Sequence, residues 1–316
     1  MSGPTRDLRS KPDVVAPGSW MLSAGSLPGV DNECDTPNGL PTPGSEGING
    51  LIFKQGTSMS AAVVAGSAAL VRQYFSEGWW PAGEQRVSNK FEPSGALVKA
   101  VLMNGAQSLL GVDNGVSGIG RLALYDGAQN FGRINLLNSL YLTNENNVRT
   151  AVWDNQRIKD NETMVYQLDY SRAGVCNSKS ISITLVWMDP PGAVGCRSCV
   201  LNDLNLSGQS LKKPFTKFYP NDLPSEEVTN NAERIIINGL RKGEKISITV
   251  KASNLVTADQ TFALAASGCI SLTQFFEEVN NEGIPISMVI GSVLFVVGTI
   301  LLGYALLNEA RKLSRR

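Results

Sequence analysis

Hydrophobic and polar residues alternate along several short segments in the second half of the chain. Isoleucine and valine alternate with serine and threonine at 181–187 and 246–250, and similar segments occur at 164–168, 234–237 and 262–264. A period of two with many β-branched residues is typical of strands that bury one face. Several such strands at this spacing predict an antiparallel all-β sandwich over residues 145–272.

The first 144 residues carry a different pattern. The helix predicted after Ser58 is rich in alanine and glycine up to 69, so it is expected to press closely against a sheet. A second helix is predicted over 94–109, where Pro93 precedes an apolar face. Prolines on both sides bound a short apolar strand at 14–16.

A long apolar segment lies near the C-terminus. Residues 286–307 contain no charge over 22 positions, which is long enough for a helix to cross a bilayer of about 30 Å. Acidic residues precede it in a linker at 273–285, and a basic tail follows at 308–316. The positive-inside rule then predicts a single-pass membrane protein, in contact with lipid through 286–307, with a cytoplasmic C-terminus and the preceding domains lumenal or extracellular. The alternatives are a buried core helix and a tail-anchored protein with residues 1–285 in the cytosol.

Composition narrows the function classes. Lysine plus arginine equals aspartate plus glutamate at 28 each, so nothing indicates a nucleic-acid partner. Cys196 and Cys199 have a zinc-ligand or redox spacing, but the chain has five cysteines and no histidine, which favours a disulfide framework with one cysteine left over. Asn161 and Asn205 begin glycosylation sequons, which matter only in a lumenal protein.

One motif carries candidate chemistry. Gly56, Thr57, Ser58 and Met59 stand where the small-residue helix begins. A serine in the first helical turn lies among backbone N–H groups without helical partners, where negative charge is stabilised. Gly56 leaves room for a substrate backbone. The alternative is an ordinary helix cap, because Ser and Thr are common at that position.

Four segments resemble, in the same order along the chain, the subtilisin-like serine proteases. They are the strand region 11–18, the Gly-Thr-Ser-Met motif at 56–59, the helix predicted at 94–109 and the turn at 131–136. The resemblance implies that residues 1–144 are the C-terminal part of a catalytic domain, an incomplete parallel-sheet α/β fold. It implies a serine endopeptidase acting on polypeptides through an acyl-enzyme on Ser58. Ala62 and Val63 are small departures from the family pattern. Residues 187–192 and 201–204 resemble the β-sandwich appended to one branch of the family.

The family's aspartate, histidine and oxyanion asparagine motifs are not found, and loss of such a base costs about 10⁶ in turnover, a value known from a subtilisin. This chain is therefore expected to be inactive alone. Two interpretations compete: a fragment of an active membrane-anchored enzyme, and a non-catalytic membrane-anchored binding or scaffold protein. The fragment is favoured, because half of an α/β domain leaves the serine helix exposed as an apolar surface. The secretory signal that the topology requires is also not found.

No cofactor is required by this reading. Asp189 and Asp203, with neighbouring asparagines, supply oxygen ligands suited to calcium, so they are weak calcium candidates. The commoner role of such residues is to cap turns. The oligomeric state is left open.

Overall fold

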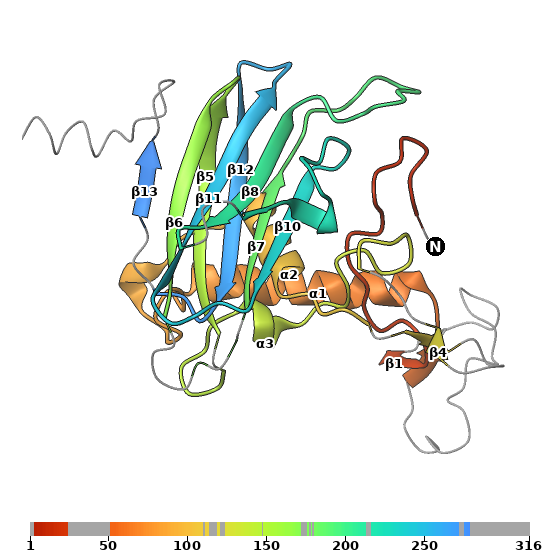
Figure 1. Cartoon of the computed structure of the whole chain (residues 1–316). Coiled ribbons are helices and arrows are strands. Elements are labelled where there is room, and N and C mark those ends of the chain that lie inside the picture. The colour runs from red at the N-terminus through yellow and green to blue at the C-terminus, as the bar shows by residue number, and fades with distance from the viewer. Residues whose placement is uncertain are drawn as a thin grey trace, which may run out of the picture.

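The body of the protein is a pair of antiparallel sheets (Figure 1). The computed structural model describes residues 3–24, 51–109, 111–113, 119–120, 124–146, 148–171, 176, 178, 180–212, 216–271 and 275–278. One sheet has the strand order β10–β7–β12–β5 and the other β13–β6–β11–β8–β9. Their bounds are β5 Arg149–Lys159, β6 Thr163–Tyr170, β7 Ser180–Trp187, β8 Asp203–Ser210, β9 Lys217–Phe218, β10 Ala232–Asn238, β11 Glu244–Asn254, β12 Asp259–Gly268 and β13 Phe275–Glu278.

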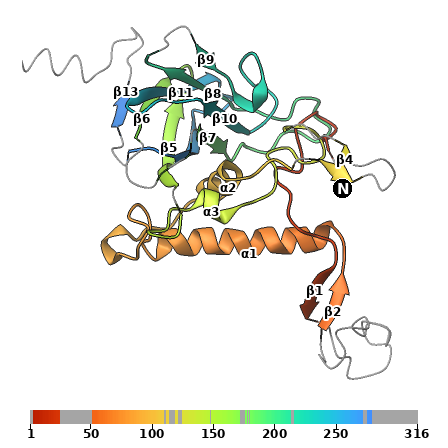
Figure 2. The same ribbon diagram turned by 60° about the horizontal axis from the view of Figure 1, so that its bottom comes forward.

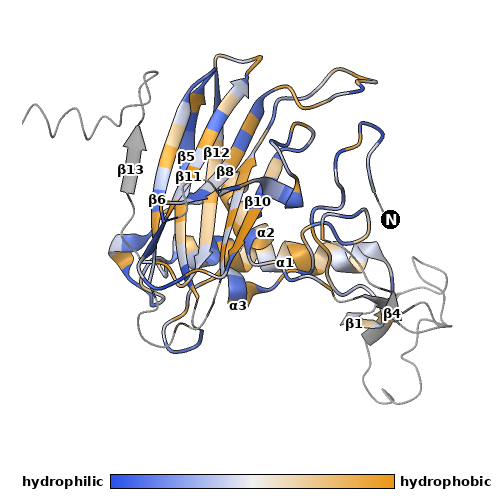
Figure 3. Ribbon diagram, in the orientation of Figure 1, coloured by the Kyte–Doolittle hydropathy of each residue, from blue (hydrophilic) through white to orange (hydrophobic). Residues whose placement is uncertain are grey.

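The alternating sequence builds the core between these sheets. Along β11, Ile246, Ile248 and Val250 are fully buried while the residues between them are more exposed. The inward side chains of the two sheets form one apolar cluster that includes Trp187 and Leu206. Figure 3 shows this alternation as hydrophobic and hydrophilic bands along the strands. The inward row of each strand is thus hidden from water, and this burial is a main source of the stability of the sandwich.

A helix covers the outer face of the four-stranded sheet. Helix α2 (Gly95–Asn104) begins at Ser94, whose hydroxyl accepts a hydrogen bond from the backbone N–H of Leu97 at 3.0 Å. Its apolar face packs with Val152, Val186 and sheet alanines in a second cluster. The four-stranded sheet is therefore buried on both faces. It is the middle one of three layers, between α2 and the five-stranded sheet.

Helix α1 (Thr57–Ser76) lies beside α2 and extends beyond the three layers (Figure 2). Only Val71, Tyr74 and Phe75, near its C-terminal end, are buried. Strands β1 (Met21–Ala24) and β2 (Leu51–Lys54) form an antiparallel ribbon at its N-terminal end. The remaining elements are short: β3 Val112–Asp113, β4 Ile119–Gly120, α3 Leu136–Ser139, and the 3₁₀ turns Val87–Asn89 and Pro220–Asp222.

Polar side chains attach the sheet to α2. The side chain of Asn104 donates to the Ser267 hydroxyl at 2.8 Å and accepts from the Thr184 hydroxyl at 2.9 Å. Ser182 donates to the backbone carbonyl of Asn104 at 2.9 Å. The serine and threonine positions of β7, which alternation alone assigns to solvent, are thus used in contacts with the helix.

A buried arginine makes the second attachment. Arg234 on β10 is 1% exposed and donates to the carbonyls of Met103, Ala106 and Phe131 at 2.8, 3.1 and 3.0 Å. Its Nε donates to the Tyr125 hydroxyl at 3.1 Å. A cation at the C-terminal end of α2 also complements the helix dipole. The sandwich and residues 95–136 are therefore joined by buried contacts.

The predicted fold class is wrong. The structure is mostly β-strand with few helices, and the sheets are antiparallel, whereas a parallel-sheet α/β domain was expected for residues 1–144. In that part of the described chain, parallel pairing is limited to one bridge between Val15 and Arg133. A parallel sheet needs neighbouring strands for the helices to cover; here α2 covers the outer face of the sandwich instead.

The predicted membrane helix and the localisation built on it are also corrected. Across the described ranges, every helix is too short or too polar to cross a membrane. The segment for which the span was predicted, residues 286–307, lies outside the described residues, as do most of its linker and its tail. The single-pass arrangement, with lumenal domains and a cytoplasmic tail, is accordingly not retained.

Candidate active site

Ser58 is the second residue of α1 and lies at the end of the helix that points away from the sandwich. Its side chain is exposed to solvent. Amide groups in a first helical turn have no partner within the helix, and the dipole places partial positive charge there. An exposed serine hydroxyl therefore lies where negative charge is stabilised.

Gly56 shapes the entry into this turn. It is the N-cap residue with φ 148° and ψ 167°, a conformation that only glycine adopts without strain, and no side chain caps the helix. The Met59 N–H returns to the Gly56 carbonyl at 3.1 Å. A helix start without a side-chain cap is unlike the ordinary Ser/Thr-capped helix that was the alternative for this motif.

The upstream strand region lies directly beside this turn. The Gly56 N–H donates to the Gly18 carbonyl at 2.7 Å, and the Ser60 hydroxyl donates to the Ala16 carbonyl at 2.9 Å. A Cβ atom on Gly18 would lie 2.1 Å from Ser60 Oγ, so only glycine fits there. Two of the motif segments recognised in the sequence are thus brought together.

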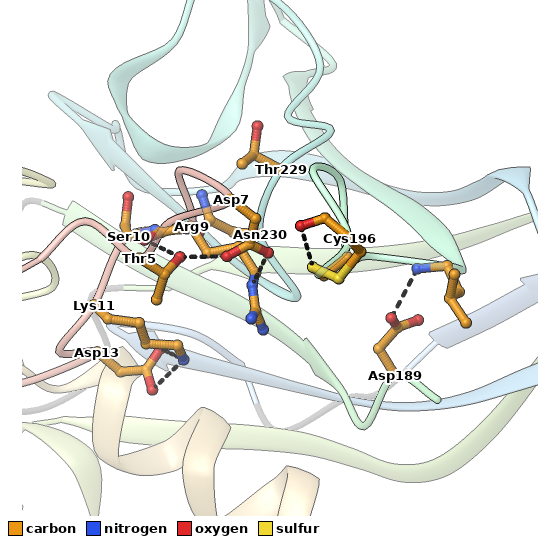
Figure 4. A network of polar contacts seen from close by, with 12 residues as sticks. Thr5, Asp7, Arg9, Ser10, Lys11, Asp13, Asp189, Cys196, Thr229 and Asn230 are labelled. Atoms are coloured by element: carbon orange, nitrogen blue, oxygen red, sulfur yellow. Dashed lines mark hydrogen bonds and ion pairs between the residues drawn. A yellow bond between two sulfur atoms is a disulfide. The ribbon is translucent and has the colours of Figure 1, made fainter. Parts of the chain in front are cut away.

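Helix α2 and the turn at 131–136, the other two motif segments, contact the same strand region. Val15 exchanges backbone hydrogen bonds with Gly132 and Ile134 at 3.0 and 3.1 Å. Lys11 binds Asp13 at 2.7 Å, and Lys99 of α2 approaches the same carboxylate at 3.4 Å; Figure 4 shows the Lys11–Asp13 pair. Burial lowers the pKa of the Lys99 ammonium. The sequence patterns did not predict the contact of Lys99 with Asp13. The Lys-Pro-Asp segment, which contains Asp13, was the only part of this contact that the sequence motifs pointed to.

Helix α1 exposes apolar side chains to solvent between residues 61 and 70. Ala61, Ala62, Ala65 and Ala69 are exposed, and Leu70 is 52% exposed. An apolar groove of about 490 Å³ follows between the helices, lined by Val64, Ala68 and Ala69 of α1 and by Val98, Lys99 and Leu102 of α2. The helix expected to press against a sheet is thus buried only at its C-terminal end, and its apolar surface is exposed.

Ser58 has no histidine partner, because the chain contains none. The described acidic group of this region, Asp13, is already bound to two lysines. Within this chain, the surroundings of Ser58 therefore include a helix N-terminus but no imidazole.

The calcium candidates lie in the sandwich. Both oxygens of Asp189 accept backbone N–H groups, from Leu201 and Asn202, at 2.8 Å each. Burial raises the pKa of Asp203, and its Oδ2 accepts from Asn205 at 3.1 Å. Among the described residues, no group of three acidic or cysteine side chains is arranged to hold a metal ion. Asp189 closes the base of the loop between β7 and β8, and calcium stays a prediction.

The two sequons differ in access. Asn161 is exposed in the turn between β5 and β6. Asn205 is 3% exposed on β8, and its amide donates to Asp203 and to Ser253. A glycan fits the surface at Asn161, whereas at Asn205 it would have to displace these contacts.

Comparison with known sequences agrees with this geometry. The sequence model of the subtilase family matches residues 1–122, the part that contains the Ser58 motif. The resemblance to the subtilisin-like serine proteases is confirmed. Two relatives in Dictyostelium discoideum are the serine protease/ABC transporter B family proteins tagD, 27% identical, and tagB, 29% identical. Each match covers 84% of this chain but 16% of the relative, so the chain spans a small part of the proteins that it is similar to.

This subtilase segment ends before the sandwich, but the similarity to the relatives extends further. A third relative, tagA of the same organism, is 28% identical over 83% of the chain. Coverage of this extent must include part of the sandwich sequence, so the similarity to these relatives is not confined to residues 1–122. The exact domain boundaries at 144 and 272 stay predictions.

Proposed function

We propose that residues 1–144 supply the nucleophile of a serine-type endopeptidase of the subtilisin-like family. The observation that carries the proposal is the position of Ser58, exposed in the uncapped first turn of α1 beside Gly56. In the proposed reaction, Ser58 Oγ attacks the carbonyl carbon of a peptide bond and an acyl-enzyme forms. The Ser58 N–H then serves as one donor to the oxyanion.

A base must take the Ser58 proton, and this chain provides no histidine for that purpose. The proposal therefore requires a polypeptide segment with the family's aspartate, histidine and asparagine motifs. The exposed alanine face of α1 and the groove beside it support this requirement, because uncovered apolar surface of this kind marks an interaction site. Without such a segment the chain is expected to be inert.

The substrate class follows from the family, since a subtilase acts on polypeptides. Subtilases commonly bind calcium, and the proposed reaction itself needs no metal ion. A non-catalytic role as a binding or scaffold protein is the competing proposal. It is supported by the cohesive attachment of the sandwich to α2 through Arg234 and Asn104.

Active-site labelling tests the proposal. The 316-residue chain is treated with a fluorophosphonate probe, alone and with a subtilase segment that carries the three missing motifs, either mixed in or fused ahead of residue 1. We expect background labelling of the chain alone, and labelling of Ser58 in the complemented protein.

Two substitutions make this test specific. Ser58→Ala should abolish labelling of the complemented protein. Ser67→Ala, on the same helix, is the matched control, because its hydroxyl only donates to the Val63 carbonyl. A complemented, folded protein in which Ser58 stays unlabelled would favour the non-catalytic role.

A further inference from the structure

The loop between β7 and β8 carries a small disulfide ring. Cys196 and Cys199 are joined across a separation of three residues. The second disulfide of the described residues joins Cys176 to Cys269 across 93 residues. The two bonds therefore constrain the chain to very different extents, because the entropy removed from the unfolded state grows with the length of the closed loop.

The loop is held closed at its base without the disulfide. The carboxylate of Asp189 binds the N–H groups of Leu201 and Asn202, as Figure 4 shows for one of them beside the Cys196–Cys199 disulfide. The indole of Trp187 donates to the Asn202 carbonyl at 2.9 Å, and the Asn202 amide binds Thr257 and Gln260. Opening the disulfide therefore leaves the loop anchored, and a purely structural role accounts poorly for the bond.

The two disulfides also differ in access. Cys176 and Cys269 are 7% and 0% exposed, within the sandwich core. Cys196 and Cys199 are partly exposed, and Arg197 and Ser198 between them are exposed. Thiol–disulfide exchange requires a thiolate to reach a sulfur atom in line with the bond, so the exposed ring is the reactive one.

The ring itself carries one charge. Arg197, which is exposed, is the only charged residue between the two cysteines, and a guanidinium that approaches a thiolate stabilises it. A thiolate that is stabilised leaves more readily when the disulfide is attacked. The Cys-x-x-Cys spacing keeps the two sulfurs together in the reduced form, so the ring can close again.

We propose that Cys196 and Cys199 form a redox-active site that exchanges with a dithiol. A thiolate of the dithiol attacks one sulfur of the ring, the Cys196–Cys199 bond breaks, and the displaced sulfur leaves as a thiolate and takes a proton from solvent. The second thiol of the partner loses its proton and attacks the mixed disulfide, which releases the other cysteine. Two electrons pass from the dithiol to the chain, and the dithiol becomes a disulfide.

Differential alkylation of the full chain tests the proposal. The native protein is equilibrated with increasing dithiothreitol, alkylated, and analysed cysteine by cysteine by mass spectrometry, while circular dichroism monitors the fold. We expect Cys196 and Cys199 to become alkylated at a dithiothreitol concentration at least ten-fold below that for Cys176 and Cys269, with an unchanged spectrum. Reduction of both pairs together, or reduction of the ring only when the fold is lost, would overturn the proposal.

Variants of Arg197 separate reactivity from simple exposure. Arg197→Ala should slow reduction of the ring roughly two- to five-fold at pH 7, because the leaving thiolate loses its cation. Arg197→Lys should restore most of the rate. Equal reduction rates in all three proteins would contradict the role given to Arg197. The dithiothreitol titration decides separately whether the Cys196–Cys199 bond is redox-active.

Discussion

Removal of the Arg234 guanidinium tests how residues 95–136 are joined to the sandwich. Arg234→Met keeps the length of the aliphatic side chain but leaves three carbonyls without this donor, the buried ones of Met103 and Phe131 and the partly buried one of Ala106. A buried acceptor that loses its partner costs roughly 1 kcal/mol or more. The guanidinium also lies 5.4 and 5.2 Å from the ring centroids of Tyr125 and Phe131, which adds up to about 1 kcal/mol.

These losses sum to roughly 4 kcal/mol, and relief from burying a charge offsets part of them. We therefore expect Arg234→Met to lower the free energy of unfolding by about 3 kcal/mol, measured by urea denaturation with tryptophan fluorescence. Arg234→Lys should lose less, because an ammonium retains the charge but reaches fewer of the carbonyls.

Arg157→Met is the matched control. Arg157 forms an exposed ion pair with Asp259 at 3.3 Å, and such pairs contribute at most about 1 kcal/mol. Limited proteolysis of the Arg234 variant should cut within residues 95–136 before it cuts the sandwich. A loss below 1 kcal/mol for Arg234→Met would show that the apolar packing of α2 is sufficient and that our reasoning on the buried arginine is wrong.

Three further predictions concern the sandwich and its attachment. Burial raises the pKa of Glu233 well above 4.5, so the contribution of this carboxyl group to stability is complete below pH 4.5 and is lost as the pH rises through the folded-state pKa. Glu233→Gln should remove this loss in pH-dependent thermal melts and raise the melting temperature at pH 7. An unchanged pH profile would contradict the assignment. Asn104→Ala should cost roughly 2 kcal/mol in urea denaturation, because the Thr184 and Ser267 hydroxyls lose their buried partner; a loss within error would show that these hydroxyls find other partners. Replacing Cys176 and Cys269 by serine should cost about 4 kcal/mol, since the bond closes a long loop, and equal melting temperatures with and without it would refute this.

The sequence alone determined the features that depend on local pattern. Alternation along 246–250 placed a strand that lies within β11, and Pro93 with the apolar run after it placed α2 to within one residue at its start. Helix α2 ends at Asn104, five residues before the prediction, because Gly105 follows it. The Gly-Thr-Ser-Met motif pointed to the resemblance to the subtilisin-like proteases, which the family model over residues 1–122 confirms, whereas the role of Ser58 stays a prediction.

The tertiary structure decided what depends on contacts between distant residues. Alternation assigned the polar positions of β7 to solvent, yet Thr184 is fully buried because α2 covers that face and Asn104 binds it. No local signal indicated that Arg234, on a predicted strand, reaches the end of a helix about 130 positions earlier. Packing also decided that α1 is exposed beside Ser58, because the part of the sheet that a parallel α/β domain would place there does not occur among the described residues. Sequence pattern records which side chains avoid water, whereas only the folded chain shows what covers them.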